Sequence, residues 1–307
     1  MLLTDAYYFV KPAVPRRIRM AVRRSIAARR RRHVGDCWPI DERAAIRPEG
    51  WPGWPHGKKF AFVLTHDVEG QRGLDRCSRL ARLEMSLGFR SSFNFVPEGE
   101  YSTSPGLRAF LAANEFEIGV HDLHHDGKLY RSLEQFERSA GRITEHLRAW
   151  GAVGFRSAFM LHNLEWLKQL DILYDASTFD TDPFEPQPDG VRTIFPFWVR
   201  RSGGGGFVEL PYTLAQDSTL FLILEETGID VWTKKLDWLA RHGGMALVNV
   251  HPDYMDFDGQ SSAPEYAPDL YEEFLRYARD RYSDDAWFAL PREVAEFYRS
   301  AVLCRAA

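Results

Sequence analysis

The chain has 307 residues, of which 45% are apolar and 27% are charged, and its formal net charge is −4. This balance is typical of a globular protein with a sizeable core, and it excludes nucleic-acid binding through bulk positive charge. The three cysteines are too widely spaced for a disulfide framework or a CxxC metal site. The chain has no run of about 18 apolar residues that would predict a transmembrane helix. Lys11 and the arginines from Arg16 onward interrupt any secretory signal, so we expect a cytoplasmic location.

The first 34 residues are strongly basic, with ten Lys and Arg side chains and one acid. Pro15 suits the first turn of a helix and no further breaker follows, so the sequence predicts a helix over residues 15–32. Ile18, Val22 and Ile26 recur every four residues and form an apolar stripe among arginines. Such a helix suits an anionic surface, which predicts peripheral contact with the inner membrane. The alternatives are a basic arm packed on the acidic remainder of the chain and an RNA-binding tail; we expect no specific nucleic-acid partner.

Residues 35–58 are rich in proline and tryptophan. Because proline cannot take part in a regular hydrogen-bonded ladder, we expect this segment to form an irregular strap on the domain surface. The chain is therefore divided into residues 1–58, the basic helix and the strap, and residues 59–307, one larger domain.

From Phe60 onward, short apolar runs alternate with longer amphipathic ones. The predicted strands are Phe60–Leu64, Ser91–Phe95, Phe116–Val120, Ala152–Arg156, Leu173–Thr178, Phe207–Leu210, Ala246–Val250 and Trp287–Leu290. The predicted helices lie near residues 74–87, 105–113, 131–149, 163–170, 229–242, 266–281 and 291–303. This alternation implies parallel βαβ units, and seven or eight of them in about 240 residues fit a (β/α) barrel. A doubly wound open sheet is the alternative, but no Gly-rich phosphate loop follows any of the strands.

Polar residues that follow the first and third strands predict a metal site. Asp67 and Glu69 come at the end of the first strand, where positions i and i+2 point to the same side. His121 and His125 follow the third strand and face one point if the segment turns helically. Two imidazoles and one carboxylate suit an ion such as Zn²⁺ and leave positions for water.

Two further strand ends carry candidate functional residues. Arg156 closes the fourth strand and His251 closes the seventh. In a barrel all these ends gather at the carboxyl-terminal face, where active sites lie. By contrast, we expect His66, His124 and His162 to lie away from the cluster.

The order of these motifs resembles that of the polysaccharide deacetylases of the NodB-homology type, carbohydrate esterase family 4. The motifs of that family read Thr-Phe-Asp-Asp-Gly, His-(Ser/Thr)-x-x-His, Arg-x-Pro and Leu-x-His. Thr65–Glu69, His121–His125, Arg156 and Val248–His251 stand in the corresponding places here. The resemblance covers roughly residues 59–300 and implies an α/β fold, a distorted (β/α) barrel of about seven units.

The chain departs from the family pattern at two positions. Val68 stands where many members carry a second Asp, so that Asp67-Val68-Glu69 resembles an Asp-x-Glu variant. Ala158 replaces the proline of Arg-x-Pro. The segment Ser177–Phe184 and the His-Pro-Asp-Tyr run resemble a subgroup found with bacterial surface-polysaccharide genes.

The resemblance implies a hydrolase that removes an N-acetyl group from a sugar of a bacterial surface polysaccharide, an exopolysaccharide or a precursor of one. Glu69, His121 and His125 would hold a divalent ion, Zn²⁺ first, with Co²⁺, Ni²⁺ or Mn²⁺ as alternatives. Its partner would be an N-acetylated carbohydrate.

The remaining site residues would move and orient protons. Asp67 would take the proton of the attacking water while Arg156 keeps it ionised, and His251 would protonate the departing amine. An acid such as Asp180 would orient His251, with Asp182 as the alternative. The roles of Asp67 and Glu69 can also be exchanged.

Three other functions remain open on the sequence. They are an amidase or cyclic-amide hydrolase on the same barrel, an O-deacetylase, and a pseudo-enzyme that binds carbohydrate without turnover. Metal content and acetate release from N-acetylated sugars distinguish them.

Overall fold

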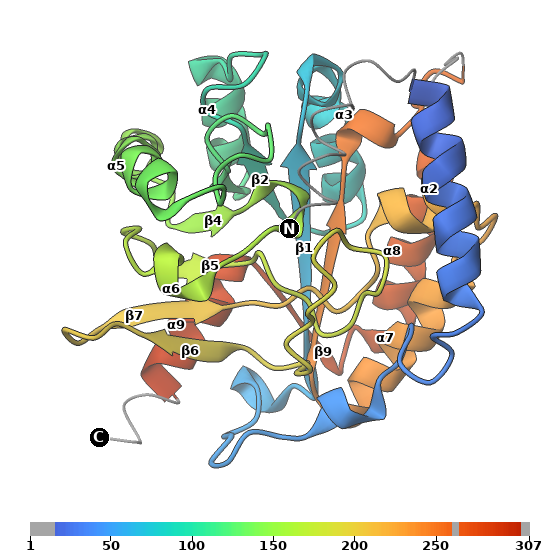
Figure 1. Ribbon diagram of the computed structural model, residues 1–307. Coiled ribbons are helices and arrows are strands. Elements are labelled where there is room, and N and C mark those ends of the chain that lie inside the picture. Colours follow the sequence, from blue (N-terminus) through green and yellow to red (C-terminus); the bar gives the residue numbers. More distant parts are fainter. Residues whose placement is uncertain (1–15, 260–263, 302–307) are drawn as a thin grey trace.

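The computed structural model describes residues 16–259 and 264–301, and its centre is one curled sheet (Figure 1). The sheet has nine strands in the described residues, in the order β6-β7-β5-β4-β3-β2-β1-β8, with β9 paired to β1. Neighbouring strands pair in parallel except β6 and β7, which are antiparallel. The strands are β1 (Phe60–Val68), β2 (Ser92–Phe95), β3 (Glu117–His121), β4 (Gly154–Arg156), β5 (Tyr174–Asp175), β6 (Phe197–Arg200), β7 (Gly206–Glu209), β8 (Met245–Val250) and β9 (Ala286–Ala289).

The long strand β1 organises the sheet because it pairs with three other strands. Its residues Phe60–Val63 pair with β9, Ala61–His66 pair with β8, and Thr65–Val68 pair with β2. Every residue of β1 is buried, as expected for a parallel strand that is covered on both faces. The carboxyl end of β1 therefore delivers Asp67 and Glu69 to the same end of the sheet as β2, β3 and β8.

The chain after β7 joins the two ends of the curled sheet. Tyr212 forms an isolated parallel bridge with Phe179 after β5, and Leu214 forms another with Val248 of β8. The amide nitrogens of Thr213 and Leu214 both donate to the carbonyl of Leu247 at 3.1 Å. The expected distorted (β/α) barrel is thus confirmed, with its closure reduced to isolated bridges.

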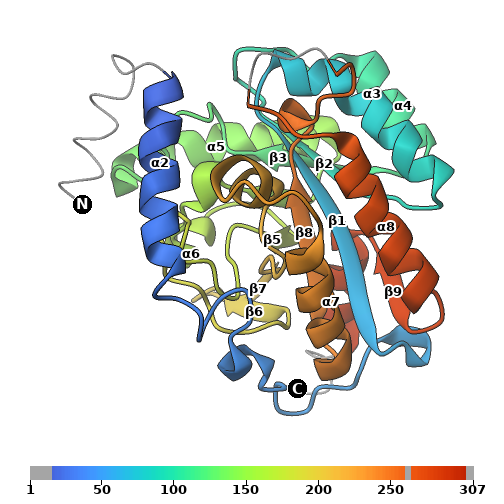
Figure 2. The same ribbon diagram turned by 90° about the vertical axis from the view of Figure 1, so that its right-hand side faces the viewer.

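Helices pack around the outside of the sheet (Figures 1 and 2). They are α3 (Gln71–Ser86), α4 (Pro105–Ala113), α5 (Leu133–Trp150), α6 (Leu164–Leu167), α7 (Asp230–His242), α8 (Pro268–Tyr282) and α9 (Pro291–Ala301). In α5 the Ser132 side chain caps the first turn, Phe136, Ile143 and Leu147 are buried at helical spacing, and left-handed Gly151 ends the helix. The predicted helices and strands are all observed, whereas β6 was not predicted.

The predicted amino-terminal helix is observed as α2 (Arg16–Arg31), which lies along the side of the barrel (Figures 1 and 2). The strap then passes beneath the amino-terminal end of the barrel to reach β1. It is held there by Trp54, which is buried and donates from Nε1 to the carbonyl of Gly243 at 2.8 Å. None of the helices in the described ranges combines the length and the apolar character that crossing a bilayer requires.

Candidate active site

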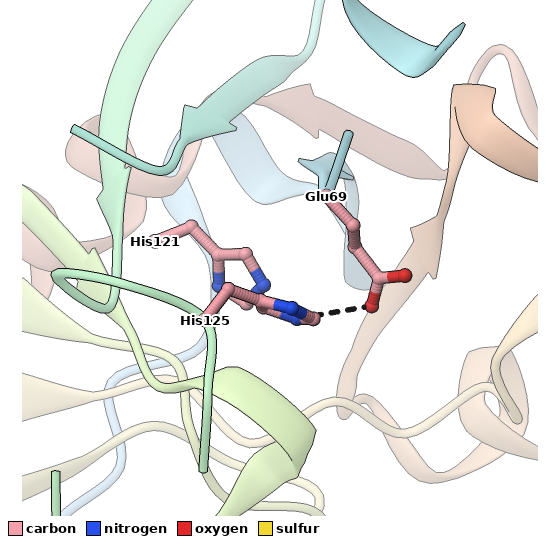
Figure 3. A group of neighbouring side chains, drawn as sticks. All are labelled: Glu69, His121 and His125. Carbon is pink, nitrogen blue, oxygen red and sulfur yellow. Dashed lines mark ion pairs between the residues drawn. The ribbon is translucent and has the colours of Figure 1, made fainter. Parts of the chain in front are cut away.

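Glu69, His121 and His125 come together at the carboxyl end of the strands (Figure 3). One ligand atom from each of the three side chains lies within 4.8 Å of the others. His125 Nε2 lies 3.2 Å from Glu69 Oε1. Glu69 follows β1, His121 ends β3 and His125 lies in the loop after β3, so three separate backbone positions define the cluster.

The loop after β3 brings the two histidines together without forming the helical turn that their spacing suggested. Asp122 and His125 instead adopt positive φ values of 57° and 52°, which are uncommon for residues other than glycine. The Asp122 carboxylate accepts hydrogen bonds from the amides of Leu123, at 2.6 Å, and Ala158, at 3.4 Å. This local hydrogen bonding supports the reversal, which leaves the two imidazole centroids 4.9 Å apart.

The hydrogen bonding of His121 leaves one of its ring nitrogens available to a metal ion. His121 Nδ1 lies 3.1 Å from the carbonyl oxygen of Arg156, which can only accept, so the proton is on Nδ1 and the lone pair on Nε2. His121 Nε2 is buried and has no hydrogen-bond partner among the described residues. This nitrogen, the neighbouring His125 imidazole and the Glu69 carboxylate form a donor set that fits a divalent ion such as Zn²⁺.

Glu69 is oriented by the segment that follows β8. Tyr254 donates from its hydroxyl to Glu69 Oε2 at 2.5 Å, and the Glu69 amide donates to Asp253 Oδ2 at 2.9 Å. The other Asp253 oxygen accepts from the Gly73 amide at 3.2 Å. A Cβ at position 73 would lie 2.0 Å from the Asp253 carboxylate, so only glycine permits this approach. The His-Pro-Asp-Tyr run therefore holds both the backbone and the side chain of Glu69.

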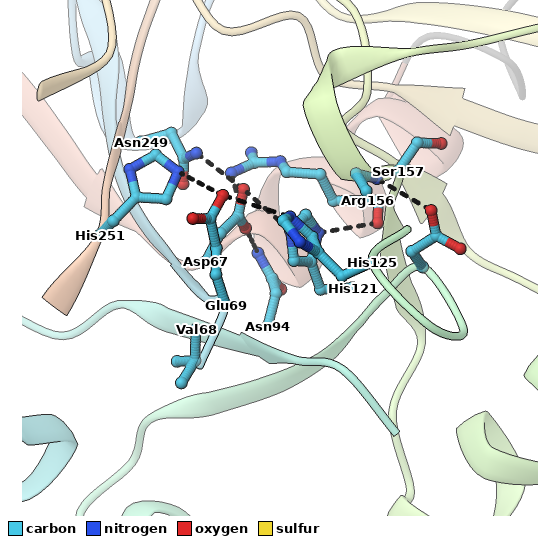
Figure 4. Close-up of polar contacts among 12 residues, drawn as sticks. Asp67, Val68, Glu69, Asn94, His121, His125, Arg156, Ser157, Asn249 and His251 are labelled. Carbon is cyan, nitrogen blue, oxygen red and sulfur yellow. Dashed lines mark hydrogen bonds and ion pairs between the residues drawn. The ribbon is translucent and has the colours of Figure 1, made fainter. Parts of the chain in front are cut away.

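Asp67 is buried beside the cluster and its two oxygens already accept hydrogen bonds (Figure 4). Asn94 Nδ2 donates to Oδ1 at 3.0 Å and Asn249 Nδ2 donates to Oδ2 at 2.8 Å. Arg156 Nη1 lies 3.4 Å from Oδ1. Burial alone would raise the pKa of Asp67, but His121 and Arg156 hold that pKa well below its usual range. Asp67 is thus ionised and held in a fixed position.

Arg156 is fully buried and spans the space between β4 and β1. Its Nε donates to the Ala176 carbonyl at 2.8 Å and its Nη1 donates to Thr65 Oγ1, also at 2.8 Å. A buried guanidinium needs a counter-ion, and the carboxylate of Asp67 lies opposite it. The ends of β1 and β4 therefore form one ion pair beneath the cluster.

His251 is held by Asp217, a residue that the sequence did not single out. His251 Nδ1 lies 2.6 Å from Asp217 Oδ1, and the His251 amide donates to Asp217 Oδ2 at 2.8 Å. Its other ring nitrogen, Nε2, is directed to the cluster and lies 3.9 Å from Glu69 Oε1. Burial lowers the pKa of His251, but Asp217 and Glu69 raise it to about 10. His251 therefore carries a proton at neutral pH.

A scan against protein-family models finds no match to this chain, and a search of curated proteins finds none. Among solved structures it is similar to the one described as "putative polysaccharide deacetylase from Mycobacterium smegmatis". The TM-score is 0.63, the identity is 20%, and the match covers 83% of this chain and 95% of that chain. The chain has the polysaccharide deacetylase fold.

Two further structures in the comparison belong to proteins of known source. The family 4 carbohydrate esterase from Streptomyces lividans, in complex with acetate, gives a TM-score of 0.44 and 10% identity over 75% of this chain and 91% of that chain. The peptidoglycan deacetylase PdaC from Bacillus subtilis gives 0.46 and 11% over 82% and 98%. Both TM-scores are low, so the deacetylase fold is assigned from the first match.

Within the deacetylase fold, Asp180 does not orient His251, contrary to the prediction. Asp180 Oδ2 instead accepts from Lys235 Nζ at 2.5 Å, and the same ammonium donates to the Pro39 carbonyl at 2.6 Å. The alternative, Asp182, accepts from the Tyr212 hydroxyl at 2.9 Å. Both acids are buried, but they connect the barrel to the strap and to Tyr212 rather than to the histidine.

Asp217 was missed because the sixth predicted strand was ended at Leu210. The extended chain continues through Tyr212 and Leu214 to β8, and Asp217 follows where this extension ends. The other site residues were found because they follow the ends of predicted strands, and Asp217 meets the same criterion once the extended segment is continued to Leu214. Asn94, which binds Asp67 from β2, gave no comparable signal because it lies within an apolar run.

The three histidines expected to lie elsewhere do so. His66 is buried and its Nε2 lies 2.7 Å from Glu84 Oε1, on the outer side of β1. His124 is exposed and its Nδ1 lies 3.0 Å from the Glu98 carbonyl. His162 Nδ1 lies 3.0 Å from the Met160 carbonyl.

Proposed function

We propose that this chain is a metal-dependent hydrolase that removes an N-acetyl group from a sugar of a bacterial surface polysaccharide, an exopolysaccharide or a precursor of one. The proposal rests mainly on one observation: a candidate proton acceptor and a candidate proton donor lie beside the same cluster of candidate metal ligands. Asp67 Oδ2 lies 4.0 Å from His121 Nε2, and His251 Nε2 lies 3.9 Å from Glu69 Oε1. The deacetylase fold and the order of the motifs support an N-acetylated carbohydrate as the substrate class.

Glu69, His121 and His125 would hold the divalent ion. Two imidazoles and one carboxylate favour Zn²⁺, with Co²⁺, Ni²⁺ and Mn²⁺ as alternatives. Such an ion, when bound, supplies Lewis-acid chemistry that makes water more acidic and a carbonyl more electrophilic. Asp67 is the less suitable ligand because Asn94 and Asn249 already occupy both of its oxygens.

The chain's own residues then divide the proton transfers. Asp67 takes a proton from the attacking water as its oxygen adds to the acetyl carbon, and Arg156 keeps Asp67 ionised. His251 gives its Nε2 proton to the nitrogen as the carbon–nitrogen bond breaks, because an amide anion is a poor leaving group. Asp217 fixes the His251 ring and stabilises its charged form. The products are acetate and an amino sugar.

Metal content tests the ligand cluster. We expect His121→Ala and His125→Ala to lose the metal that the unchanged protein retains after dialysis. His124→Ala is the matched control, because that imidazole is exposed and lies against Glu98 rather than the cluster. Equal metal stoichiometry in all four proteins would show that the cluster is misplaced.

Acetate release tests the reaction. The purified protein is incubated with N-acetylated sugars in polymeric, lipid-linked and nucleotide-linked form, and we expect release from at least one of them. Release only from O-acetylated sugars would assign an O-deacetylase, and hydrolysis only of small cyclic amides would assign an amidase. Bound metal without turnover of any acylated substrate would assign a carbohydrate-binding pseudo-enzyme.

A further inference from the structure

One face of α2 presents an apolar stripe to solvent. Ile18, Val22 and Ile26 are 54%, 51% and 49% exposed. The described residues contain only two other exposed large apolar side chains, Ile46 and Leu133, and these lie on separate elements. Three such side chains at four-residue spacing form a continuous line along the helix.

The opposite face of α2 already holds the helix on the barrel. Ala27 is buried on this face. Arg24 Nε donates to the carbonyl of Leu222, at 2.9 Å, in the π-helical turn η5 (Ser218–Ile223). Arg24 and Arg31 also form ion pairs with Glu225 and Glu226, at 2.7 and 2.5 Å. The stripe is therefore not needed to attach the helix, and its exposure needs another explanation.

Positive charge surrounds the stripe. Arg29 continues its line one turn beyond Ile26, and Arg23 and Arg32 are also exposed. The sequence contains no acidic residue from position 6 to position 35. An apolar line with arginines beside it matches the boundary of an anionic bilayer, where apolar side chains enter the acyl region and guanidinium groups bind phosphate headgroups.

We propose that the outward face of α2 docks the protein on an anionic phospholipid bilayer. The exposed arginines would repel those of a second copy, which disfavours self-association through this face. Single-stranded or duplex RNA would bind the arginines but would leave the aliphatic stripe without a partner. A bilayer satisfies both parts of the surface. α2 runs along the side of the barrel, with its amino-terminal end towards the end of the barrel to which β1 points (Figures 1 and 2).

Vesicle co-sedimentation of the full-length chain tests this proposal. We expect binding to vesicles of phosphatidylcholine mixed with phosphatidylglycerol, and none to phosphatidylcholine alone. Replacing the stripe in the triple variant Ile18→Ser, Val22→Ser, Ile26→Ser should weaken binding about tenfold or more, because each side chain loses its apolar transfer energy. Arg29→Gln with Arg32→Gln should weaken binding and reduce its sensitivity to salt.

Ile46→Ser is the matched control, since Ile46 is 76% exposed and lies outside α2. It should bind vesicles as the unchanged protein does. Circular dichroism and metal content check that the stripe variant is folded.

Equal binding by the stripe variant and the unchanged protein would overturn the proposal, as would the absence of vesicle binding. Tight RNA binding that ignores the stripe, or a dimer that the stripe variant abolishes, would assign the face to that other partner. Vesicle binding needs no turnover, so this proposal and the proposed function can fail separately.

Discussion

Two groups of buried carboxyl side chains lie in this barrel and differ in what faces them. Asp67, Glu69 and Asp217, the histidine-facing acids, lie against imidazoles, and Asp67 also against a guanidinium. Asp182 and Glu185, the tyrosine-bound acids, instead share the hydroxyl of one tyrosine. Burial is similar in both groups except that Glu69 is less covered.

The basic side chains that face Asp67 and Glu69 decide the charge of these two acids. Burial by itself raises the pKa of a carboxyl group. At Glu69 this effect is outweighed by His125 and its neighbours, which hold the pKa of Glu69 well below its usual range. No such cation offsets burial and mutual repulsion at Asp182, whose pKa is raised to about 8. The pKa of Glu185 is raised too, with burial as the largest cause. Charge state in this barrel therefore follows the partner rather than the depth of burial.

The largest expected effect is that of removing the ionised acceptor. Asp67→Asn keeps the shape of the side chain but cannot take a proton, so acetate release should fall by about 10²–10⁴-fold. Metal content should stay unchanged. The control is Asp182→Asn, a change of the same chemistry in the tyrosine-bound group, which should alter kcat/KM by only a few-fold. Comparable losses in the two variants would mean that the two groups do not differ in function.

A smaller effect is expected at the orienting acid. Asp217→Asn removes the negative charge beside His251, so the pKa of His251 should fall from about 10 towards its usual value. Since the proposed rate depends on protonated His251, the alkaline limb of the pH–rate profile should move to lower pH. Amide hydrolysis near pH 8 should slow by roughly tenfold to a hundredfold, while a nitrophenyl ester, whose leaving group needs no proton, should be spared.

Asp180→Asn separates this role from a merely structural one. Asp180 is as deeply buried but binds Lys235, so the variant should leave the alkaline limb where it is. A shift of that limb in Asp180→Asn, or its absence in Asp217→Asn, would contradict the assignment.

Asp217 and Asp180 also show which features of the site could be predicted from the sequence and which could not. The alternation of short apolar runs with amphipathic helical patterns predicted the barrel. The polar residues that follow the predicted strands placed Asp67, Glu69, Arg156 and His251 together, because parallel strands share one carboxyl edge. Asp180 was selected for its nearness to a strand end, but its partner Lys235 lies on α7, far along the chain. A pattern in sequence carries no signal of such long-range pairing.

The details that the sequence could not supply are of the same kind. The closure of the barrel depends on isolated bridges at Tyr212 and Leu214, which leave no regular strand pattern. The meeting of His121 and His125 depends on positive φ values at residues that are not glycine. Neither feature follows from local propensity, because both are imposed by tertiary contacts.

A further prediction concerns the hydroxyl that binds a histidine-facing acid. Tyr254→Phe removes the hydrogen bond to Glu69 Oε2, which orients the proposed ligand. Affinity for Zn²⁺, measured by competition with a fluorescent chelator, should fall by about tenfold. Tyr266→Phe is the control, since its hydroxyl donates to Asp217 Oδ2 at 2.9 Å instead. A fall of the same size in Tyr266→Phe would mean that Glu69 is not specifically held by Tyr254.

The smallest expected effect is on stability and comes from the tyrosine-bound acids. In the folded chain this pair retains a proton up to a pH near 8, whereas an unfolded carboxyl group loses it near pH 4. Between these values the folded state binds more protons than the unfolded state, so the free energy of unfolding falls as pH rises. Asp182→Asn, which stays neutral, should lose this slope. The free energy of unfolding is measured with urea for both proteins at two pH values one unit apart, near pH 6. Between these pH values it should fall by about 1 kcal/mol more in the unchanged protein than in Asp182→Asn. Parallel pH dependences would mean that Asp182 and Glu185 are both ionised, and the contrast between the two groups of acids would then disappear.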